Sequence, residues 1–362
     1  LNSAAERPAS DVLAVKTMAF AKPGDIAGLR ISGGANSASI RWTFAYDTFY
    51  KVMRSDKENG TYAVVADKVD GTSYVDEGLT NGQTYYYKVQ PYNEAGEGNA
   101  SAILKATPEA GKYMHLAFDE NEGTTAYDEW GGYDGTFLQG ASFAEGRNEG
   151  YAAKLVKSSK SYIELPKGAL SRLSDFTIAT WIKIPGGKGR IFDFGSGAGT
   201  FMMAAATGTG VRYKITCEKG VFDYTAPCKW TANDWHHLVI TQKGTEMAFY
   251  FDGEEVGTAV NEKEVYPKDM GVTTQNWLGR SQWASDAYCD HVYDDFRIYN
   301  YAIEASDVTT LYEDKEILTG ITQLEDRSNG VRSEAIYDLQ GRKVFHPVKG
   351  IYIQKGKKFV VK

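Results

Sequence analysis

The sequence predicts an all-β protein that contains more than one sandwich domain. It holds 24 Tyr, 16 Phe and 7 Trp together with 38 Gly, a mixture typical of strands joined by tight turns. Residues 294–301 alternate with period two, which places Asp295 and Arg297 on one face and Phe296 and Ile298 on the other, as in a half-buried strand. A length of 362 residues allows two to four compact units.

The charge balance narrows the classes of partner. Forty Lys and Arg against 47 Asp and Glu give a net charge of −7, whereas proteins that bind nucleic acids or membrane surfaces use net positive fields. No run of about 18 or more apolar residues occurs, so we expect no membrane span. No signal peptide is recognisable, but the chain begins at Leu1 and not at Met, so this absence decides nothing.

The three cysteines exclude a scaffold built on disulfides. Cys217 and Cys228 lie eleven residues apart around an expected turn near Gly220, a spacing that allows one disulfide across a hairpin. The alternative is that Cys217, Cys228 and Cys289 are all buried free thiols.

An internal repeat marks the start of the chain. Residues 2–13 align with residues 93–104 at an offset of 91, the length of one small sandwich domain. We therefore expect residues 1–22 to be the last strand of a preceding domain or a linker, and the chain to be the C-terminal part of a larger protein. A chance match between Ser/Ala-rich segments is the alternative.

Residues 23–108 show short alternating strands with turn signals every 8 to 12 residues. Trp42 falls on the second expected strand, and Leu79 precedes Tyr85 by six residues. In these positions the segment resembles a fibronectin type III domain, with Tyr85 at the tyrosine corner. The resemblance implies a spacer sandwich whose core includes Trp42, Tyr85, Tyr87 and Val89.

Residues 112–313 form a longer unit, suited to a two-sheet jelly roll. We expect its strands at residues 113–118, 161–165, 176–184, 190–194, 201–205, 212–217, 235–242, 247–251 and 292–299, and a short turn of helix within 302–312. A series of motifs then resembles a laminin-G-like, concanavalin A-like jelly roll: Phe118-Asp119-Glu120, Asp175 to Trp181, Trp235-His236-His237-Leu238, Tyr250-Phe251-Asp252-Gly253, Leu278-Gly279-Arg280 and Asp294 to Tyr299. The resemblance implies a module that binds glycans or packs against other domains in secreted carbohydrate-active enzymes and adhesins.

Residues 314–362 carry turn signals at Gln340-Gly341 and Gln354-Lys355-Gly356 between strands with hairpin spacing. This small β tail resembles the C-terminal sorting domain of secreted Bacteroidetes proteins. The resemblance implies a secretion machinery as partner and a secreted, cell-surface or periplasmic location.

The jelly-roll segment lacks the carboxylate pattern of the glucanases that share this fold. Glucanases of this fold carry Glu-x-Asp-x-x-Glu on one strand, because alternation then aims the carboxylates into the cleft. That spacing does not occur, nor do Gly-x-Ser-x-Gly, His-Glu-x-x-His or a phosphate loop. We expect no catalysis in this chain.

We expect several aspartates of the jelly roll to bind a structural calcium ion. Ca2+ takes six to eight oxygen ligands, so Asp119 with Asp294 or Asp295, and Asp128 from an adjoining loop, could join the first strand to the last. The alternative is that Asp119 caps a turn and Asp295 pairs with Arg280 or Arg297. His236 and His237 point to opposite faces of a strand and cannot share one ion, so we expect structural roles.

Glycan binding needs exposed aromatic rings beside polar groups. Trp181 and Trp235 lie on apolar strands and are expected in the core. Polar, loop-like surroundings mark five candidate ligand-binding residues, with burial against the sandwich as the alternative: Trp283, Tyr288, Trp130, Tyr133 and Arg280.

These features predict a noncatalytic glycan-binding and spacer region of a secreted or surface polysaccharide-degrading protein. A glycoside hydrolase or polysaccharide lyase domain would lie upstream in the same polypeptide. The alternative is a surface adhesin or matrix protein whose jelly roll binds a protein partner.

Overall fold

The computed structural model describes residues 21–148, 150–315 and 317, and the backbone of four strands between residues 336 and 361. The predicted repeat at residues 2–13 lies outside the described residues. The chain divides into two compact units, one made of Leu1–Arg30, Arg41–Tyr74 and Tyr85–Lys105, the other of Ile31–Ile40, Val75–Thr84 and Ala106–Lys362. The predicted domain limits at 23–108, 112–313 and 314–362 stay predictions.

The strands that precede residue 107 form two sheets. One has the order β1-β2-β5 and the other β4-β3-β6-β7, with β8 also pairing β6. Their bounds are β1 Arg30–Gly34, β2 Ser37–Arg41, β3 Phe49–Ser55, β4 Ala63–Val69, β5 Ser73–Glu77, β6 Tyr85–Asn93, β7 Gly96–Glu97 and β8 Leu104–Ala106. On β6 every second side chain is buried, because successive residues of a strand face opposite sides. The predicted burial of Trp42, Tyr85, Tyr87 and Val89 is confirmed.

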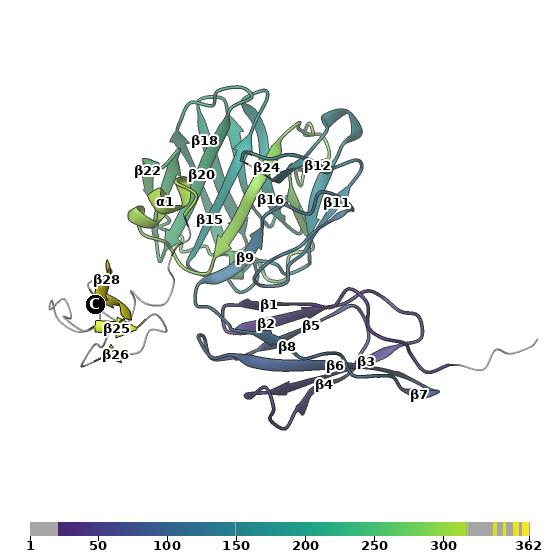
Figure 1. Cartoon of the computed structure of the whole chain (residues 1–362). Coiled ribbons are helices and arrows are strands. Elements are labelled where there is room, and N and C mark those ends of the chain that lie inside the picture. Colours follow the sequence, from purple (N-terminus) through teal and green to yellow (C-terminus); the bar gives the residue numbers. More distant parts are fainter. Residues whose placement is uncertain are drawn as a thin grey trace, which may run out of the picture. The chain divides into compact units, whose positions relative to one another are not determined.

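The jelly roll consists of two eight-stranded sheets (Figure 1). The first jelly-roll sheet has the order β10-β11-β14-β23-β16-β17-β18-β19. Its strands are β10 Thr125–Ala126, β11 Gly135–Leu138, β14 Tyr162–Leu165, β16 Lys188–Gly195, β17 Phe201–Thr207, β18 Gly210–Cys217, β19 Gly220–Pro227 and β23 Gln275–Leu278.

The second jelly-roll sheet has the order β12-β13-β24-β15-β20-β21-β22, and β9 pairs with β24 outside that path. Its strands are β9 Lys112–Leu116, β12 Ser142–Glu145, β13 Tyr151–Lys154, β15 Phe176–Lys183, β20 Trp235–Lys243, β21 Glu246–Phe251, β22 Glu254–Val260 and β24 Val292–Tyr299. The register pairs Phe296 with Leu116 and Arg297 with His115, so the stretch at 294–301 does bring the beginning and the end of the domain together.

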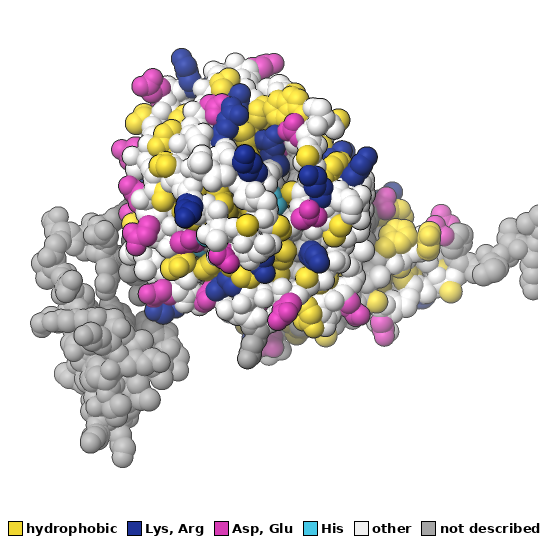
Figure 2. Space-filling model, turned by 90° about the horizontal axis from the view of Figure 1, so that it is seen from above, with side chains coloured by type: hydrophobic (Ala, Val, Ile, Leu, Met, Phe, Trp, Pro, Cys, Tyr) yellow, Lys and Arg dark blue, Asp and Glu magenta, His cyan; other side chains and the backbone are white. Residues whose placement is uncertain are grey.

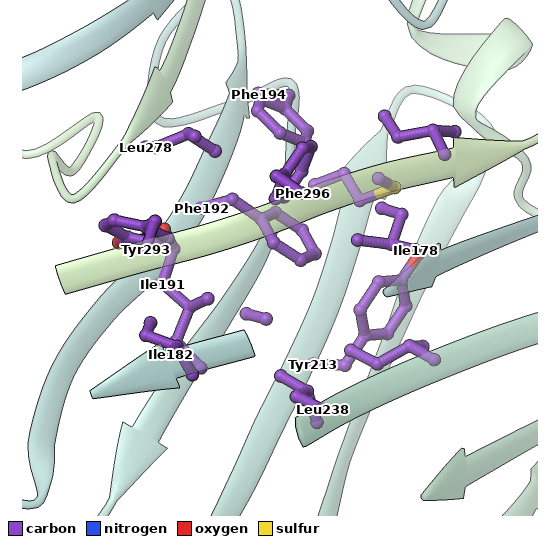
Figure 3. Close-up of a cluster of buried hydrophobic side chains, with 14 of the residues drawn as sticks. Ile178, Ile182, Ile191, Phe192, Phe194, Tyr213, Leu238, Leu278, Tyr293 and Phe296 are labelled. Atoms are coloured by element: carbon purple, nitrogen blue, oxygen red, sulfur yellow. The ribbon is translucent and has the colours of Figure 1, made fainter. Parts of the chain in front are cut away.

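The main core fills the space between the two jelly-roll sheets. Each sheet sends every second side chain inward, as Figure 3 shows for Ile178 and Ile182 of β15, Phe192 and Phe194 of β16, and Phe296 of β24. These five side chains are 2 % exposed or less. Removing a phenyl group of this kind from water stabilises the fold by about 1.5–3 kcal/mol.

A second apolar cluster covers the opposite side of the second jelly-roll sheet. Ala179, Val239 and Tyr299, which alternate with core residues, contact Val308 and Leu311 of the helix α1 Ala305–Tyr312. The predicted helical turn within 302–312 is therefore present, and one apolar side of it packs on the sheet (Figure 1). Two short 3-10 helices lie in connections between strands: η1 Lys157–Ser159 between β13 and β14, and η2 Pro267–Met270 between β22 and β23. No helix in the described part of the chain has the length and apolar character needed to cross a membrane.

The cysteines are free, and the geometry explains why Cys217 and Cys228 do not pair. In the β18–β19 hairpin Cys217 pairs with Gly220 beside the turn, whereas Gly210 pairs with Pro227 at the far end. Cys228 follows Pro227, so eight residue rises separate the two cysteines, roughly 26 Å along the strands. A disulfide needs Cα atoms within about 7 Å. Cys289 alone is buried, so the alternative of three buried thiols holds in part.

Between residues 336 and 361 four strands pair in the order β26-β25-β27-β28. Their bounds are β25 Ile336–Asp338, β26 Lys343–Val344, β27 Gly350–Gln354 and β28 Lys357–Val361. The hairpin β27–β28 pairs Gln354 with Lys357, in agreement with the turn expected at Gln354-Lys355-Gly356. The identity of this segment as a sorting domain stays a prediction.

Candidate functional site

A groove lies on the outer side of the first jelly-roll sheet, where β16, β17 and β18 run next to one another. Outward residues of these strands alternate with core residues such as Met202, Ala204 and Tyr213. The groove has a volume of about 560 Å³. Its lining consists of Gly189, Arg190, Phe201, Met203, Ala205, Ala206, Thr207, Arg212, Lys214, Trp283, Asp286 and Ala287.

Trp283 borders this groove from the loop between β23 and β24. Its side chain is 37 % exposed, which is unusual for so large an aromatic ring. It stands edge-on to Phe201, with ring centroids 4.8 Å apart, and the Arg190 guanidinium carbon lies 5.7 Å from the indole centroid. Trp283 is thus at the surface, as predicted.

Hydrogen bonds fix the loop that carries Trp283. Arg190 Nη2 donates to Ser281 Oγ and to Asp286 Oδ2, both at 2.9 Å, and Ser281 Oγ donates to Asp286 Oδ2 at 2.7 Å. The Gln282 side chain accepts from Gly197 N and donates to Gln275 O, each at 2.9 Å. The loop is therefore held on a rigid sheet before any ligand arrives, which lowers the entropy lost on binding.

Asp193 lies beneath the same loop and is fully buried. Burial raises the pKa of its carboxyl group to about 7, although the charge of Arg190 and a hydrogen bond from Gln282 N oppose this shift. Asp193 Oδ1 has no hydrogen-bond partner among the described residues. Sequence analysis did not single out Asp193, because a lone Asp within an apolar strand carries no motif.

Arg280 and Tyr288 come from the same loop but contact other strands. The Arg280 guanidinium carbon lies 4.0 Å from the ring centroid of Trp277 and 4.5 Å from that of Tyr162. Tyr288 lies 6.5 Å from Tyr162. These predicted residues therefore form an aromatic and cationic cluster over β14 and β23, whereas Trp283 lies over β16 and β17, and neither Arg280 nor Tyr288 lines the groove.

The prediction that Trp130 is a surface aromatic is wrong. Trp130 is 6 % exposed and packs between His115 and Tyr299, at centroid distances of 4.9 and 5.2 Å. Tyr133 is half-buried and stacks on Tyr113 at 5.1 Å. Neither residue offers an open ring face to a sugar.

Asp128 explains why this loop folds inward. Its carboxylate is fully buried and accepts backbone N–H groups from His115 and Trp130 at Oδ1, and from Gly131 and Tyr133 at Oδ2, at 2.7 to 3.1 Å. The polar, glycine-rich sequence around Trp130 thus folds around one carboxylate. Asp128 does not line the pocket that contains the other predicted calcium ligands.

Asp119, Asp294 and Asp295 do line one pocket, of about 290 Å³. Asp119 Oδ1 accepts Tyr151 N at 2.8 Å, and Asp294 Oδ2 accepts Arg147 N at 2.9 Å. Burial and the charges of Asp295 and Asp119 raise the pKa of Asp294 to about 6, although its hydrogen bond with Arg147 opposes this.

Asp295 is held by Arg297 and His115. Arg297 donates from Nε to Oδ1 at 3.0 Å and approaches Oδ2 with Nη2 at 2.9 Å, and His115 Nε2 lies 2.5 Å from Oδ1. Although burial lowers the pKa of His115, its contacts with Asp295 and Glu129 raise it overall. Asp295 thus pairs with Arg297, which is the alternative to calcium binding that the sequence left open.

Among the described residues no three His, Cys, Asp or Glu side chains are grouped so that they could hold a metal ion. Asp119 and Asp294 are hard oxygen donors of the kind that Ca2+ takes, but they supply only part of a six- to eight-ligand shell. A calcium site at Asp119 and Asp294 therefore stays a prediction that requires backbone carbonyl groups as well.

His236 and His237 point to opposite sides of β20, as predicted. His236 Nδ1 lies 2.8 Å from Asp252 Oδ2, and its Nε2 accepts Thr231 N at 3.0 Å. His237 is 3 % exposed and packs on Trp181 at 5.0 Å; burial lowers its pKa to about 4. Trp181 is buried as expected, whereas Trp235 is half-buried beneath the Lys183 ammonium group.

The cations of the groove were not predicted from the sequence. Arg212 and Lys214 are outward residues of β18, between the buried Val211, Tyr213 and Ile215. This alternation is visible in the sequence, but it does not reveal which strand lies alongside. The pairing of β16, β17 and β18 brings the cations to Trp283.

Comparisons with known proteins found one family and several solved structures that are similar to parts of this chain. No curated protein matches the chain. Among solved structures, domain 4 of AbnA, a GH43 extracellular arabinanase from Geobacillus stearothermophilus, in complex with arabinotriose, is 23% identical, with a TM-score of 0.46 over 56% of this chain and 99% of that one. The binding domain of Paraclostridial Mosquitocidal Protein 1 is 16% identical, with a TM-score of 0.46 over 56% of this chain and 52% of that one. The botulinum neurotoxin serotype D binding domain is 16% identical, with a TM-score of 0.44 over the same shares. Residues 157–309 match the Laminin_G_3 family, described as the Concanavalin A-like lectin/glucanases superfamily, which supports the jelly roll expected in this segment.

Proposed function

We propose that the jelly roll is a noncatalytic glycan-binding module and that the groove beside Trp283 is its binding site. The exposure of Trp283 at the border of the groove carries this proposal. An indole face packs against the C–H groups of a sugar ring, and the neighbouring polar groups bond its hydroxyl groups.

Three features support the choice of this site over the rest of the surface. The groove holds several sugar rings by volume, at about 560 Å³. Its floor on β16 to β18 is rigid, and the loop above it is held by Arg190. The residues lie within the segment that matches the concanavalin A-like superfamily.

A comparison on a glycan array tests this function. Wild-type protein should bind a restricted set of plant or microbial polysaccharides, and Trp283→Ala should lose that binding while it keeps its melting temperature. Equal binding by both proteins, or no binding to any glycan, would count against the site.

The wider protein is also a proposal. The resemblance of residues 23–108 to a fibronectin type III spacer and of residues 314–362 to a sorting tail supports a secreted or surface protein with a polysaccharide-degrading domain upstream. The upstream gene sequence tests this directly, because a glycoside hydrolase or polysaccharide lyase domain would be recognisable there. An upstream region without such a domain would favour the adhesin alternative.

A further inference from the structure

We propose that the groove selects acidic polysaccharides, whose uronate carboxylates or sulfate groups lie between Arg190 and Arg212. This inference rests on the proposed glycan-binding function and names the substrate class of that site. It is built from the strand register, the charges that line the groove and the position of Trp283.

The register places two arginines on either side of a small residue. Arg190 of β16 pairs with Ala205 of β17, and Ala205 pairs with Arg212 of β18. Neighbouring strands lie about 4.8 Å apart, so the two arginine Cα atoms are roughly 10 Å apart across the methyl group of Ala205. Both arginines line the groove, Arg190 beside Asp286 and Arg212 beside Asp223, so an anionic group in the groove lies within reach of either guanidinium group.

Lys214 extends the cationic side of the groove. It pairs with Met203 in the adjacent row, and its ammonium nitrogen lies 5.9 Å from the ring centroid of Phe201. Three cationic residues and one acidic residue, Asp286, therefore line the groove. Asp193 and Asp223 lie beside the same cations, so the groove offers cationic donors that are paired with carboxylates and not a net positive charge.

Basic and acidic side chains lie next to one another on the surface of the jelly roll. Figure 2 shows Lys and Arg side chains intermixed with hydrophobic and acidic ones on the face of the jelly roll turned to the viewer. The net charge of the chain therefore does not exclude cationic donors at one site. An anionic ligand meets attraction at short range there, in spite of the charge of the whole chain.

Asp223 of β19 holds Arg212 in a way that leaves donors for a ligand. Arg212 Nε donates to Asp223 Oδ1 at 2.8 Å and Nη2 donates to Oδ2 at 2.5 Å, so this pair does not use Nη1. Lys214 Nζ lies 3.7 Å from the same carboxylate. The Arg212 side chain is 44 % exposed and exposed ion pairs contribute little to stability, so a ligand carboxylate can share or replace Asp223.

Trp283 indicates a saccharide and not a bare anion. A phosphate or sulfate ion gains nothing from the exposed indole, whereas a uronate or sulfated sugar presents a C–H face to the ring and its charged group to the arginines. Trp283, Arg190, Arg212 and Lys214 line the same groove, so a ligand with both properties can contact the indole and a cation together.

Binding by the full chain to matched polymers tests the inference. Affinity electrophoresis would compare polygalacturonate with the same polymer after carboxyl reduction, and dextran sulfate with dextran. At least one acidic polymer should bind about tenfold more tightly than its neutral counterpart, equivalent to about 1.4 kcal/mol, and should weaken as NaCl rises from about 50 to about 500 mM. The arm that binds identifies carboxylate or sulfate as the group recognised.

Two substitutions with opposite expected effects make the test specific. Arg212→Gln should weaken binding of the acidic polymer about tenfold, because it removes one of the two guanidinium groups. Asp223→Asn should tighten it, because it removes the competing carboxylate. Lys243→Gln removes one positive charge from the opposite sheet, where Lys243 pairs with Glu304, and should change nothing.

The results separate the two proposals. Neutral and acidic polymers bound equally, with loss of both in Trp283→Ala, would overturn the acidic preference and leave glycan binding in place. No binding to any polymer would overturn both proposals. Weaker binding in Arg212→Gln and Lys243→Gln alike would overturn the assignment to the groove.

Discussion

Trp283 and Phe201 meet edge-on at a centroid distance of 4.8 Å, although 82 residues separate them in the chain. Phe201 is 2 % exposed and forms part of the sheet, whereas Trp283 is 37 % exposed and belongs to a loop. The buried ring thus supports the exposed one. An aromatic ring pair of this kind contributes about 0.5–1.5 kcal/mol beyond burial, enough to hold the indole in place without hiding it.

Replacing Phe296 by Ala should destabilise the jelly roll strongly. Its side chain is fully buried between the two sheets, next to Phe194. We expect the free energy of unfolding to fall by about 3–5 kcal/mol in urea denaturation, because a cavity remains. Val221→Ala, at a 49 % exposed position on β19, should change it by less than about 0.5 kcal/mol. A loss below about 1 kcal/mol for Phe296→Ala would contradict the core described above.

Asp128→Asn should destabilise the protein although it is nearly isosteric. The amide group can accept hydrogen bonds only at its oxygen, so two of the four backbone N–H groups would face an NH2 group. We expect a loss of about 1–3 kcal/mol in the free energy of unfolding. Asp290, which accepts the single N–H of Lys157, provides the control: Asp290→Asn keeps its acceptor and should be nearly neutral. Equal effects would mean that Asp128 does not organise the loop.

The stability of Asp193→Asn relative to wild type should be greater at high pH than at low pH. Because burial raises the pKa of Asp193 to about 7, the folded state holds this proton more tightly than the unfolded state. The stabilisation is complete below the ordinary carboxyl pKa near 4 and is lost as pH rises through about 7. The difference in free energy of unfolding between Asp193→Asn and wild type should therefore grow from pH 4 to pH 8.

Asp223→Asn is a control for this pH dependence, because its effect on the free energy of unfolding should depend on pH in the opposite sense. Its hydrogen bonds with Arg212 lower the pKa of Asp223, so its contribution is present above the ordinary carboxyl pKa and is lost as pH falls. This variant should therefore be slightly less stable than wild type near pH 7 and equal to it in acid. A flat profile for Asp193→Asn in urea denaturation would show that Asp193 is not protonated in the folded state near pH 6.

Calcium should raise the melting temperature of protein pretreated with EDTA if Asp119 and Asp294 bind it. A ligand that binds only the folded state stabilises it in proportion to the logarithm of its concentration. Asp294→Asn should abolish the shift, whereas Asp286→Asn, which alters a carboxylate in the other pocket, should keep it. An unchanged melting temperature of the wild-type protein up to millimolar calcium would contradict calcium binding at Asp119 and Asp294.

The sequence predicts the long strands of the jelly roll better than its short and edge strands. The nine expected jelly-roll strands begin and end within two residues of those observed, because apolar side chains recur on their inner faces. Seven further strands were not predicted. Strands β10, β11, β12, β13 and β23 have only two to four residues, too few for a clear alternation. Strands β19 and β22 are longer, but most of their side chains are exposed or half-buried, so their hydrophobic periodicity is weak.

The candidate site was predicted only in part, for a different physical reason. The position of Trp283 could be inferred from its polar loop, but that of Trp130 could not, because one buried carboxylate draws a similar loop inward. Arg190 and Arg212 meet across Ala205 only through strand pairing. Local sequence does not encode which strands become neighbours, so the groove appears only in the folded chain.

The most direct test is the affinity of wild-type protein and Trp283→Ala for the polysaccharide that wild type binds best. We predict a loss of at least about 1.4 kcal/mol, or tenfold, with an unchanged melting temperature. Tyr46→Ala, which removes an 86 % exposed aromatic ring outside the jelly roll, should bind like wild type. Equal affinity of wild type and Trp283→Ala would contradict the assignment of the groove as the glycan-binding site.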